Sequence, residues 1–511
     1  MASKPAKKPQ SEDTGKSSPS TIDVKNPVTG ELIGVVPKTD QKTIAHVFEQ
    51  AQDAFPRWAA LSVAQRGQML RKWGDLMWAE QNRVMRMIRD ETGKNDTGAF
   101  LELIGLDNTL NYYIPQAPKL LAPQRRPSLF PIIQRSRVFF KPHGVVGIIS
   151  PWNYPLFLAL GDAVPALLAG NVIVLKPSEF TPFTAMVAVD LMMQAGIPQN
   201  VVQIVTGDGT TGKALIDLAD YVCFTGSTAT GRKVAVQAAE RLIPYSLELG
   251  GKDPMIVLED ANLDIASASA IMNACENAGQ MCISTERVYV AEKIYDEYVG
   301  RVVDYAKSLT MGAGDGLDVH MGSMTTEREL LRTEAHIQDA LNKGAELVFG
   351  GKRRPELGPL FIEPAVLIHV DHSMMVMKDE TFGPIVPIMK VSNEQEAIRL
   401  ANDSEYGLSA SIYTRDLARG ERLAVQLETG SVTINRGSAG VAASIALPWG
   451  GDKASGVGRR GGPEGLYRFT KAQSVFTDTL IGTQASLTLL DPLTLFGVKA
   501  MRVVRRFVSD I

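Results

Sequence analysis

The sequence predicts an α/β fold with two domains, each built on a mainly parallel sheet that helices cover on both faces. Its 511 residues are too many for one simple core, so two or three domains are expected. From Gly144 onward, short and uniformly apolar runs alternate with helical segments, a pattern typical of parallel strands that are buried on both faces. After Gly251 a second series of the same kind begins, which predicts the second domain.

The expected elements follow in order along the chain. Residues 43–91 carry apolar side chains at helical spacing and are predicted to form helices. The first alternating series has strands at 145–149, 171–175, 201–205 and 221–224, and helices at 156–168, 183–194, 210–218 and 228–242. The second has strands at 254–258, 286–290 and 408–413, and helices at 266–278, 294–309 and 417–427. We expect each series to form its own sheet.

Composition excludes several classes of protein. The chain has 53 basic and 56 acidic residues and a net charge of −3, so no basic surface for nucleic acid is expected. Three cysteines cannot form a disulfide framework and indicate a reducing, cytoplasmic location. The histidines are too scattered for a zinc site, and no metal is expected. Residues 1–20 are rich in Lys, Ser and Pro, which predicts a disordered extension and not a secretory signal.

Cys282 is the first candidate for chemistry. A thiol attacks well only as the thiolate, so a nearby group must take its proton. None of the six histidines lies within 30 residues of Cys282, whereas Glu248 stands between two leucines and is followed by two glycines, a setting that predicts burial. A cysteine with a buried glutamate as base points to a thioester that water later cleaves. Taken alone, Cys282 is equally well explained as an inert core thiol.

Two glycine-rich segments follow predicted strands. Residues 207–213 fit both G-x-G-x-x-G and G-x-x-x-x-G-K, but Ala214 stands where a P-loop needs Ser or Thr, and no acid follows at the dinucleotide spacing. We interpret this segment as a plain turn near a nucleotide. Residues 224–231 also join a strand to a helix, and the free N–H groups at that helix start make this loop the better phosphate site.

Six motifs occur in a fixed order. They are Pro151–Pro155, Leu175–Glu179, Phe224–Gly231, Leu247–Lys252, Gly279–Cys282 and Glu380–Pro384. Together they resemble the NAD(P)-dependent aldehyde dehydrogenase superfamily, over about residues 25–475. The resemblance implies oxidation of an aldehyde to a carboxylic acid through a thiohemiacetal and a thioester. It makes Cys282 the nucleophile, Glu248 the general base and Asn153 the side chain whose amide holds the oxyanion, a role that needs fixed hydrogen-bond donors.

The resemblance also implies a dinucleotide cofactor. The residues it places there are Lys176 and Glu179 at the adenosine ribose, Gly226 and Ser227 at the pyrophosphate, Glu380 and Phe382 at the nicotinamide half, and Trp152 in the same site. The Glu179 carboxylate suits the ribose hydroxyls and would repel a 2′-phosphate. NAD is therefore the expected cofactor, and Lys176 nearby leaves NADP open.

The family fold assigns a part to each segment. A Rossmann-like dinucleotide-binding domain is expected at 21–123 and 143–249, and a catalytic α/β domain at 250–466. Residues 124–142 and 467–478 match a small β element through which the family forms homodimers or homotetramers. The tail, 479–511, ends the resemblance. Its residues 498–508 fit an amphipathic basic helix, which predicts contact with a membrane surface or docking on the protein itself, with a disordered tail as the third alternative.

The substrate is less well defined by the sequence. Residues 139–147, 162–167 and 458–465 are most similar to a branch that includes succinate-semialdehyde dehydrogenases. An anionic aldehyde needs a cation in the pocket, and Arg436 is the candidate, with a solvent-facing or subunit-facing role as the alternative. Residues 439–446 are small and apolar, which equally suits a medium-chain, long-chain or aromatic aldehyde. Transfer of the thioester to coenzyme A and a catalytically inactive cofactor-binding homologue are the competing classes.

Overall fold

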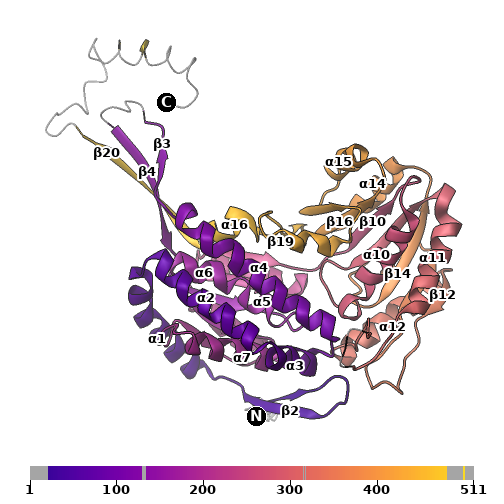
Figure 1. The fold of residues 1–511 in the computed structure, drawn as a ribbon, viewed down its shortest axis with the longest axis horizontal. Helices are drawn as coiled ribbons and strands as arrows, with labels where there is room; N and C mark the ends of the chain where they lie inside the picture. Colours follow the sequence, from indigo (N-terminus) through magenta and orange to yellow (C-terminus); the bar gives the residue numbers. More distant parts are fainter. Residues whose placement is uncertain are drawn as a thin grey trace, which may run out of the picture.

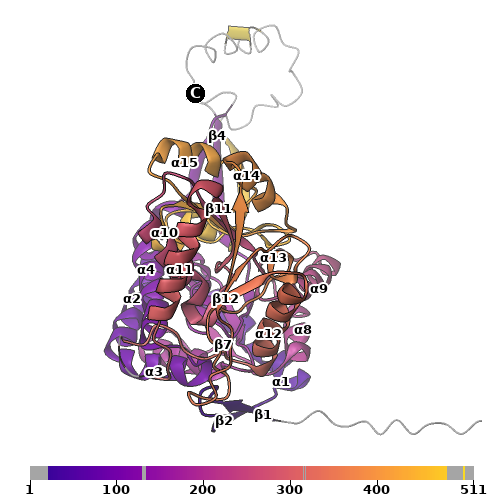
Figure 2. The same cartoon turned by 90° about the vertical axis from the view of Figure 1, so that its right-hand side faces the viewer.

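The computed structural model describes residues 21–128, 134–314, 316, 318–479, 496, 499 and 500. The chain forms two α/β bodies side by side, with a long β element that projects away from both (Figures 1 and 2). The indigo and magenta body holds most of the first half of the chain, and the salmon and orange body holds the second series of strands and helices (Figure 1). The predicted pair of α/β sheets is confirmed.

The first body contains a six-stranded sheet in the order β19-β9-β8-β5-β6-β7. The four strands expected in the first series are parallel, β9 adds a fifth parallel strand that was not expected, and β19 at the edge is antiparallel to β9. The strands are β5 (Val145–Ile149), β6 (Val172–Lys176), β7 (Val202–Ile204), β8 (Tyr221–Thr225), β9 (Tyr245–Glu248) and β19 (Gly456–Val457). The chain runs from β5 outward through β6 to β7 and then returns to β8 on the other side of β5. Such a reversal of strand order leaves a crevice at the carboxyl ends of β5 and its neighbours, where α/β folds bind ligands.

Helices cover this sheet because their apolar faces match its buried strands. Helix α1 packs against β5, β6 and β7, and α2 packs on α6 and α7. The indole N–H groups of Trp58 and Trp73 are buried and donate to the carbonyls of Leu167 (3.2 Å) and Ala188 (3.0 Å). The helices are α1 (Gln41–Ala60), α2 (Val63–Ala79), α3 (Gln81–Thr92), α4 (Asp96–Leu120), α5 (Phe157–Leu160), α6 (Ala163–Ala169), α7 (Pro182–Gln194), α8 (Gly209–Ile216), α9 (Thr228–Glu240) and α16 (Gly462–Tyr467).

The second body contains a seven-stranded sheet in the order β12-β13-β14-β11-β10-β16-β17. All neighbours are parallel except the edge pair of β12 with β13. The strands are β10 (Asp253–Val257), β11 (Thr285–Ala291), β12 (Glu346–Gly350), β13 (Ala365–Ile368), β14 (Ile385–Val391), β16 (Ser409–Tyr413) and β17 (Ser431–Ile434). The helices are α10 (Leu263–Cys275), α11 (Tyr295–Ser308), α12 (Glu327–Asn342), α13 (Met375–Lys378), α14 (Glu394–Asn402) and α15 (Leu417–Ala424), with 3-10 turns at Glu276–Gly279, Glu292–Ile294 and Ser438–Ala443.

The projecting element is a three-stranded antiparallel sheet in the order β20-β4-β3 (Figure 1). It consists of β3 (Gln124–Arg126), β4 (Gln134–Pro142) and β20 (Thr470–Asp478). Most of β20 is exposed. Two short ribbons complete the fold, β1 (Thr21–Lys25) with β2 (Leu32–Pro37), and β15 (Tyr406–Gly407) with β18 (Asp452–Lys453).

The structure differs from the sequence-based expectation at two places, one just before Cys282 and one beside the strand that carries Glu248. The helix expected over 266–278 ends at Cys275, because Asn277, Ala278 and Gly279 all have left-handed φ angles of 50°, 54° and 74°. Strand β19 falls in the range expected for the second domain, yet its hydrogen bonds join the first sheet. Helices α4 and α12 were not among the expected elements.

Two expectations fall outside the described part of the chain. The N-terminal extension at 1–20 and nearly all of the tail at 480–511 lie there, so the amphipathic helix predicted at 498–508 stays a prediction. Within the described residues, none of the helices is both long enough and apolar enough to cross a membrane.

Candidate active site

The loops after β5 and β8 lie at the crevice where the strand order reverses. The loop after β5 carries Trp152 and Asn153, and the loop after β8 carries Gly226 and Ser227. Ser227 is the N-cap residue of α9 and its side chain accepts from the N–H of Thr230 (3.4 Å). The other N–H groups of the first turn point out of the helix start, which favours an anion there. A Cβ on Gly226 would lie 2.7 Å from the Phe224 ring, so a larger residue in this turn would displace that ring.

Cys282 is brought to the same crevice by the left-handed turn after α10. The side-chain amide of Asn277 donates to the carbonyls of Asn153 and Gln280, both at 3.1 Å. The side-chain amide of Asn153 donates to the carbonyl of Gln280 at 2.8 Å. Because Gln280 stands two residues before Cys282, these bonds fasten the Asn153 loop of one body to the cysteine loop of the other.

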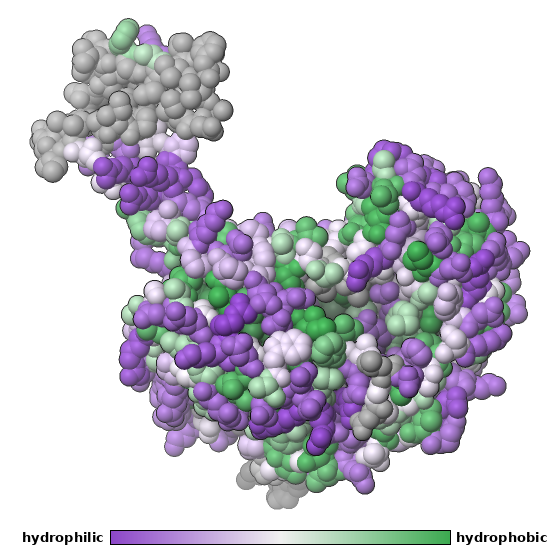
Figure 3. Space-filling model, in the orientation of Figure 1, coloured by the Kyte–Doolittle hydropathy of each residue, from purple (hydrophilic) through white to green (hydrophobic). Residues whose placement is uncertain are grey.

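One cavity of about 580 Å³ brings together most of the residues singled out by the sequence. It lies where the two bodies meet, and the space-filling view is hollowed between them on the face shown (Figure 3). Its lining includes Trp152, Asn153, Gly226, Ser227, Cys282, Glu380 and Phe382, together with Pro151, Leu158, Thr225, Leu249, Gly250, Arg328, Glu329 and Arg332. Residues from five of the six motifs, all except Leu175–Glu179, therefore share one space.

Burial raises the pKa values of both Cys282 and Glu248. Burial raises the pKa of the Cys282 thiol to about 12, and the acidic groups of Asp253, Glu380 and Glu248 add to the shift. Burial raises the pKa of Glu248 to about 7, while Arg460 and Arg468 act in the opposite direction. Atom Oε1 of Glu248 is buried without a hydrogen-bond partner among the described residues. The thiol therefore needs a base, and an uncommitted carboxyl that titrates near neutrality stands within electrostatic reach.

Glu380 and Phe382 are held by a buried ion pair below their loop. Glu286 accepts from the backbone N–H of Thr381 (2.8 Å) and of Phe382 (2.9 Å), and Lys252 donates to it at 2.6 Å. These bonds fix Phe382 at a left-handed φ of 57°, a conformation that is strained for an aromatic residue and that needs such support.

The fixed Phe382 ring meets an aromatic side chain of the other body. The ring centroids of Phe382 and Trp152 are 5.5 Å apart, in an edge-to-face arrangement. Glu380 accepts from the N–H of Gly251 (3.1 Å), and burial raises its pKa to about 8. The cavity thus has two aromatic walls beside a buried acid, which suits a flat polar ring.

Lys176 and Glu179 lie beyond this cavity, at the carboxyl end of β6. The Lys176 ammonium is buried, donates to the carbonyls of Pro177 (2.8 Å) and Gly207 (2.7 Å), and stands 3.7 Å from the Glu179 carboxylate. Burial lowers the pKa of Lys176, and Glu179 partly offsets that effect. Lys176 is the last residue of β6, the strand next to β5, and Glu179 lies in the loop that follows it, on the side toward which a long ligand in the crevice would extend.

Arg436 is not brought to Cys282. It is exposed after the end of β17 and is absent from the cavity lining. Two arginines that the sequence analysis did not single out are there instead, on α12. Arg328 and Arg332 pair with Glu329 at 2.7 and 3.1 Å and line the cavity with it. Their spacing of four residues on one helix face was a usable signal, but that helix had not been expected.

Comparison with known protein families shows the family to which this chain belongs. The model of the aldehyde dehydrogenase family matches residues 14–475. The chain belongs to the aldehyde dehydrogenase family. It is therefore an oxidoreductase that oxidises aldehydes, as the resemblance of its motifs implied, and the expected use of NAD(P) fits this family.

Several aldehyde dehydrogenase relatives are similar over nearly the full length. The chain is 40% identical over 478 residues to a Mycobacterium ulcerans protein named "Putative succinate-semialdehyde dehydrogenase NADP(+) 2", covering 93% of this chain and 92% of the relative. It is 38% identical to a glutarate-semialdehyde dehydrogenase of Pseudomonas aeruginosa, covering 87% and 92%. Among solved structures, a Mycobacterium tuberculosis aldehyde dehydrogenase complexed with NAD+ has a TM-score of 0.86 at 34% identity, covering 91% and 96%.

Proposed function

We propose that this aldehyde dehydrogenase converts its substrate to a carboxylic acid with Cys282 as nucleophile, Glu248 as general base and Asn153 as oxyanion donor. The observation that carries the proposal is the shared cavity, which contains Cys282, Asn153 and the α9 phosphate loop. The residues also fit the cofactor. A helix start for the pyrophosphate and the Trp152–Phe382 walls for the flat ring lie along one crevice. When bound, NAD(P)+ supplies the acceptor for a hydride.

The first step needs a proton acceptor and an oxyanion site. The Cys282 sulfur forms a bond to the aldehyde carbon while its proton goes to Glu248, because the raised pKa of the thiol leaves little thiolate at neutral pH. The carbonyl oxygen becomes an oxyanion, and the amide of Asn153 and the N–H of Cys282 donate to it. The oxyanion then collapses as the C–H bond breaks and hydride leaves, and the product is a thioester on Cys282.

The second step is hydrolysis of that thioester. Once Glu248 has released the first proton to solvent, it takes a proton from a water molecule as the water oxygen attacks the thioester carbon. The C–S bond then breaks to release the acid, and the proton on Glu248 returns to the Cys282 thiolate. An ionised glutamate with a pKa near 7 is well matched to this task at neutral pH. This use of water also separates the proposal from transfer to coenzyme A, and the acid yield with and without coenzyme A distinguishes the two.

NAD is the proposed preferred cofactor, with NADP accepted. The Glu179 carboxylate is partly exposed and stands at the far end of the crevice beside Lys176, where it would meet a 2′-phosphate with like charge. The mycobacterial relative carries NADP(+) in its name, and the similar M. tuberculosis structure contains NAD+. Initial rates of NADH and NADPH formation, compared as kcat/KM for the two cofactors, test the preference.

Succinate semialdehyde is the first candidate substrate. The names of the relatives at 40% and 38% identity, which refer to succinate and glutarate semialdehydes, support a short aldehyde that carries a carboxylate at its other end. Arg436 supplies no support, because it lies outside the cavity.

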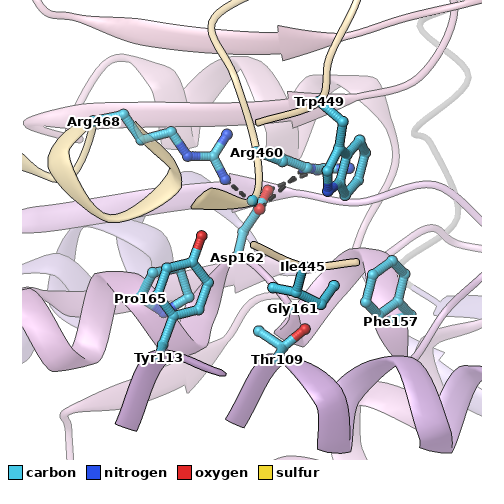
Figure 4. A pocket seen from close by; sticks show the side chains of 11 residues that line it. Thr109, Tyr113, Phe157, Gly161, Asp162, Pro165, Ile445, Trp449, Arg460 and Arg468 are labelled. Atoms are coloured by element: carbon cyan, nitrogen blue, oxygen red, sulfur yellow. Dashed lines mark hydrogen bonds and ion pairs between the residues drawn. The ribbon is translucent and has the colours of Figure 1, made fainter. Parts of the chain in front are cut away.

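A medium-chain or aromatic aldehyde is the second candidate. A small second pocket has Phe157, Ile445 and Trp449 in its lining, together with the charged side chains of Asp162, Arg460 and Arg468 (Figure 4). It borders the first cavity, because Arg460 in its wall bonds to Thr225 in the wall of the other. The apolar side chains in this mixed lining would pack against a hydrocarbon substituent. Rates with succinate semialdehyde, hexanal and benzaldehyde decide between the two candidates.

A homodimer or homotetramer is proposed as the assembly. Strand β20 pairs only with β4 among the described residues and exposes Val475 and Phe476 along the projecting sheet. An exposed strand with apolar side chains favours pairing with another chain. Sedimentation of the full chain measures its state, and a monomer at micromolar concentration would refute the proposal.

A further inference from the structure

A buried charge cluster stands behind Glu248 and has no part in the steps described above. The carboxylate of Asp162 accepts two hydrogen bonds from the Arg460 guanidinium, from Nε at 3.0 Å and from Nη2 at 2.7 Å. It accepts a further hydrogen bond from Arg468 (Figure 4). All three side chains are buried. Asp162 precedes α6, whereas Arg460 and Arg468 flank α16. The two arginines therefore come from a distant part of the chain to meet one carboxylate.

The two guanidinium groups lie against the sheet face from which Glu248 projects. Arg460 donates to the hydroxyl of Thr225 at 2.6 Å, and Arg468 donates to that of Ser246 at 3.3 Å. Thr225 is the register partner of Glu248 on the neighbouring strand, and Ser246 precedes Glu248 by two residues on β9. Register partners and residues two apart on a strand share one face of the sheet. Glu248 and both arginines are therefore on the same side.

The segment that carries Arg460 also covers the carboxyl of Glu248. The backbone of Arg460 exchanges two hydrogen bonds with Trp449, at 2.8 and 2.6 Å. At the next residue, Gly450, an added Cβ would lie 3.1 Å from Oε1 of Glu248. The carboxyl of Glu248 thus lies under a turn that the backbone bonds between Trp449 and Arg460 hold in place. Water therefore has little room to screen the charges of Glu248 and the arginines.

The charges of the cluster balance only when Glu248 is ionised. Two arginines and Asp162 leave one positive charge, and a carboxylate at Glu248 neutralises it. Burial raises the pKa of Glu248, Arg460 and Arg468 lower it, and Asp162 raises it. Arg459 has a weaker lowering effect, and its guanidinium bonds instead to Asp452 and to the carbonyl of Gly451.

The remaining titratable groups on this side do not supply a compensating charge. Tyr113 of α4 donates to the carbonyl of Gly462, and burial raises its pKa well above its usual value. Tyr221 and Cys223 on β8 have pKa values raised by burial, the latter to about 12. The thiol of Cys282 on the opposite body is neutral for the same reason. At neutral pH the balance is thus set mainly by the two arginines and the two carboxyl groups, with the smaller contribution of Arg459.

We infer that Arg460 is a positioning residue that holds Glu248 in its ionised form, and that Asp162 moderates this effect. The inference rests on the base role proposed for Glu248. A base is competent only without its proton, so the cluster sets the pH above which the thiol and the hydrolytic water can be deprotonated. The two partners act on Glu248 with opposite sign, which a purely structural role for the cluster does not predict.

An infrared pH titration of the cofactor-free protein tests the inference without any need for turnover. The C=O stretch of a protonated carboxyl that is present in the wild type and missing in E248Q reports Glu248. In R460Q the midpoint of this band should rise by about one pH unit or more, since loss of a nearby opposite charge disfavours the carboxylate. In D162N the midpoint should fall, because a like charge has been removed.

Two further variants separate charge from packing. R459Q removes the adjacent guanidinium, which bonds elsewhere, and should shift the midpoint by much less than R460Q does. R460K keeps the positive charge but loses the two-pronged bond, and should keep the midpoint within about half a unit of wild type. If R460Q does not fold, as judged by circular dichroism, D162N and R460K still decide.

The result that overturns the inference is a Glu248 midpoint that R460Q leaves unchanged or lowers. A D162N midpoint that rises, or an R460K midpoint displaced by a unit or more, overturns it too. These outcomes are distinct from failure of the proposed function, which would appear as absent aldehyde oxidation in a wild-type protein whose Glu248 still titrates as described.

Discussion

Replacement of Asn153 by alanine tests the oxyanion site most sharply. Asn153 is buried, and its amide donates to the carbonyl of Gln280 at 2.8 Å, two residues before Cys282. Loss of an oxyanion donor costs about 3 kcal/mol of transition-state stabilisation, which corresponds to a fall in kcat of roughly a hundredfold or more. Loss of the ground-state hydrogen bond lowers the free energy of unfolding by only about 1 kcal/mol.

The assay is NAD(P)H absorbance at saturating cofactor over a range of aldehyde concentrations. We expect kcat to fall while KM changes little, because the donor acts mainly on the oxyanion. Asn273→Ala is the matched control. Its amide also donates to one carbonyl, that of Ser269 on its own helix, but it does not line the cavity, so its kcat should stay near that of wild type. An N153A enzyme with kcat within threefold of wild type refutes the assigned role.

Three further predictions concern the base, the cofactor and the nicotinamide-side loop. Glu248→Gln should slow the first turnover of NAD(P)H, because the thiol loses its base, and should slow steady-state turnover further, because thioester hydrolysis loses the same base. Wild-type turnover should fall as pH drops through about 7, since the raised pKa of Glu248 leaves it protonated below that value; a flat profile from pH 6 to 8 removes it from the mechanism. Glu179→Gln should raise kcat/KM for NADP relative to NAD by about tenfold, because it removes a charge facing the 2′-phosphate. An unchanged ratio of the two kcat/KM values would show that the adenosine ribose does not lie beside Glu179. Glu286→Gln breaks a buried ion pair with Lys252. It should lower the free energy of unfolding in urea by about 3 kcal/mol and raise the KM for the cofactor. Wild-type values of both quantities would contradict the conclusion that Glu286 holds the Phe382 loop in place.

The sheets could be predicted because their strands are buried on both faces. Residues 145–149 and 254–258 read as continuous apolar runs, and the structure buries nearly all of both segments in parallel sheets. The glycine loop at 224–231 could be predicted for a related reason, since a strand-to-helix turn with small residues has a recognisable composition. Such local patterns carry their information within a few residues.

The features that were missed depend on residues far apart in the sequence. The bond between Asp162 and Arg460 joins positions 298 residues apart, and neither residue shows alone that the other neutralises it. Strand β19 has only two residues and is defined by its pairing with β9, not by its own composition. The left-handed turn at Asn277 and Ala278 is also set from outside, because the amide of Asn277 bonds to the carbonyl of Asn153.

Arg436 shows the limit of a charge-based argument for specificity. An arginine near the end of a strand is compatible with a substrate carboxylate, but its side chain reaches only what the fold places beside it. The structure exposes Arg436 and instead puts Arg328 and Arg332 at the cavity. Their position on α12 follows from packing of that helix, which the sequence pattern alone did not locate.

The most direct test of the account is the mass of the peptide that contains Cys282 during turnover. Glu248→Gln protein is mixed with aldehyde and NAD(P)+, quenched in acid after one turnover, digested and examined by mass spectrometry. We predict that the Cys282 peptide gains the mass of the acyl group, that Cys223 and Cys275 stay unmodified, and that omission of the cofactor abolishes the adduct. An acyl group on another residue, or NAD(P)H formed with no adduct on Cys282 at any quench time, would contradict the central claim.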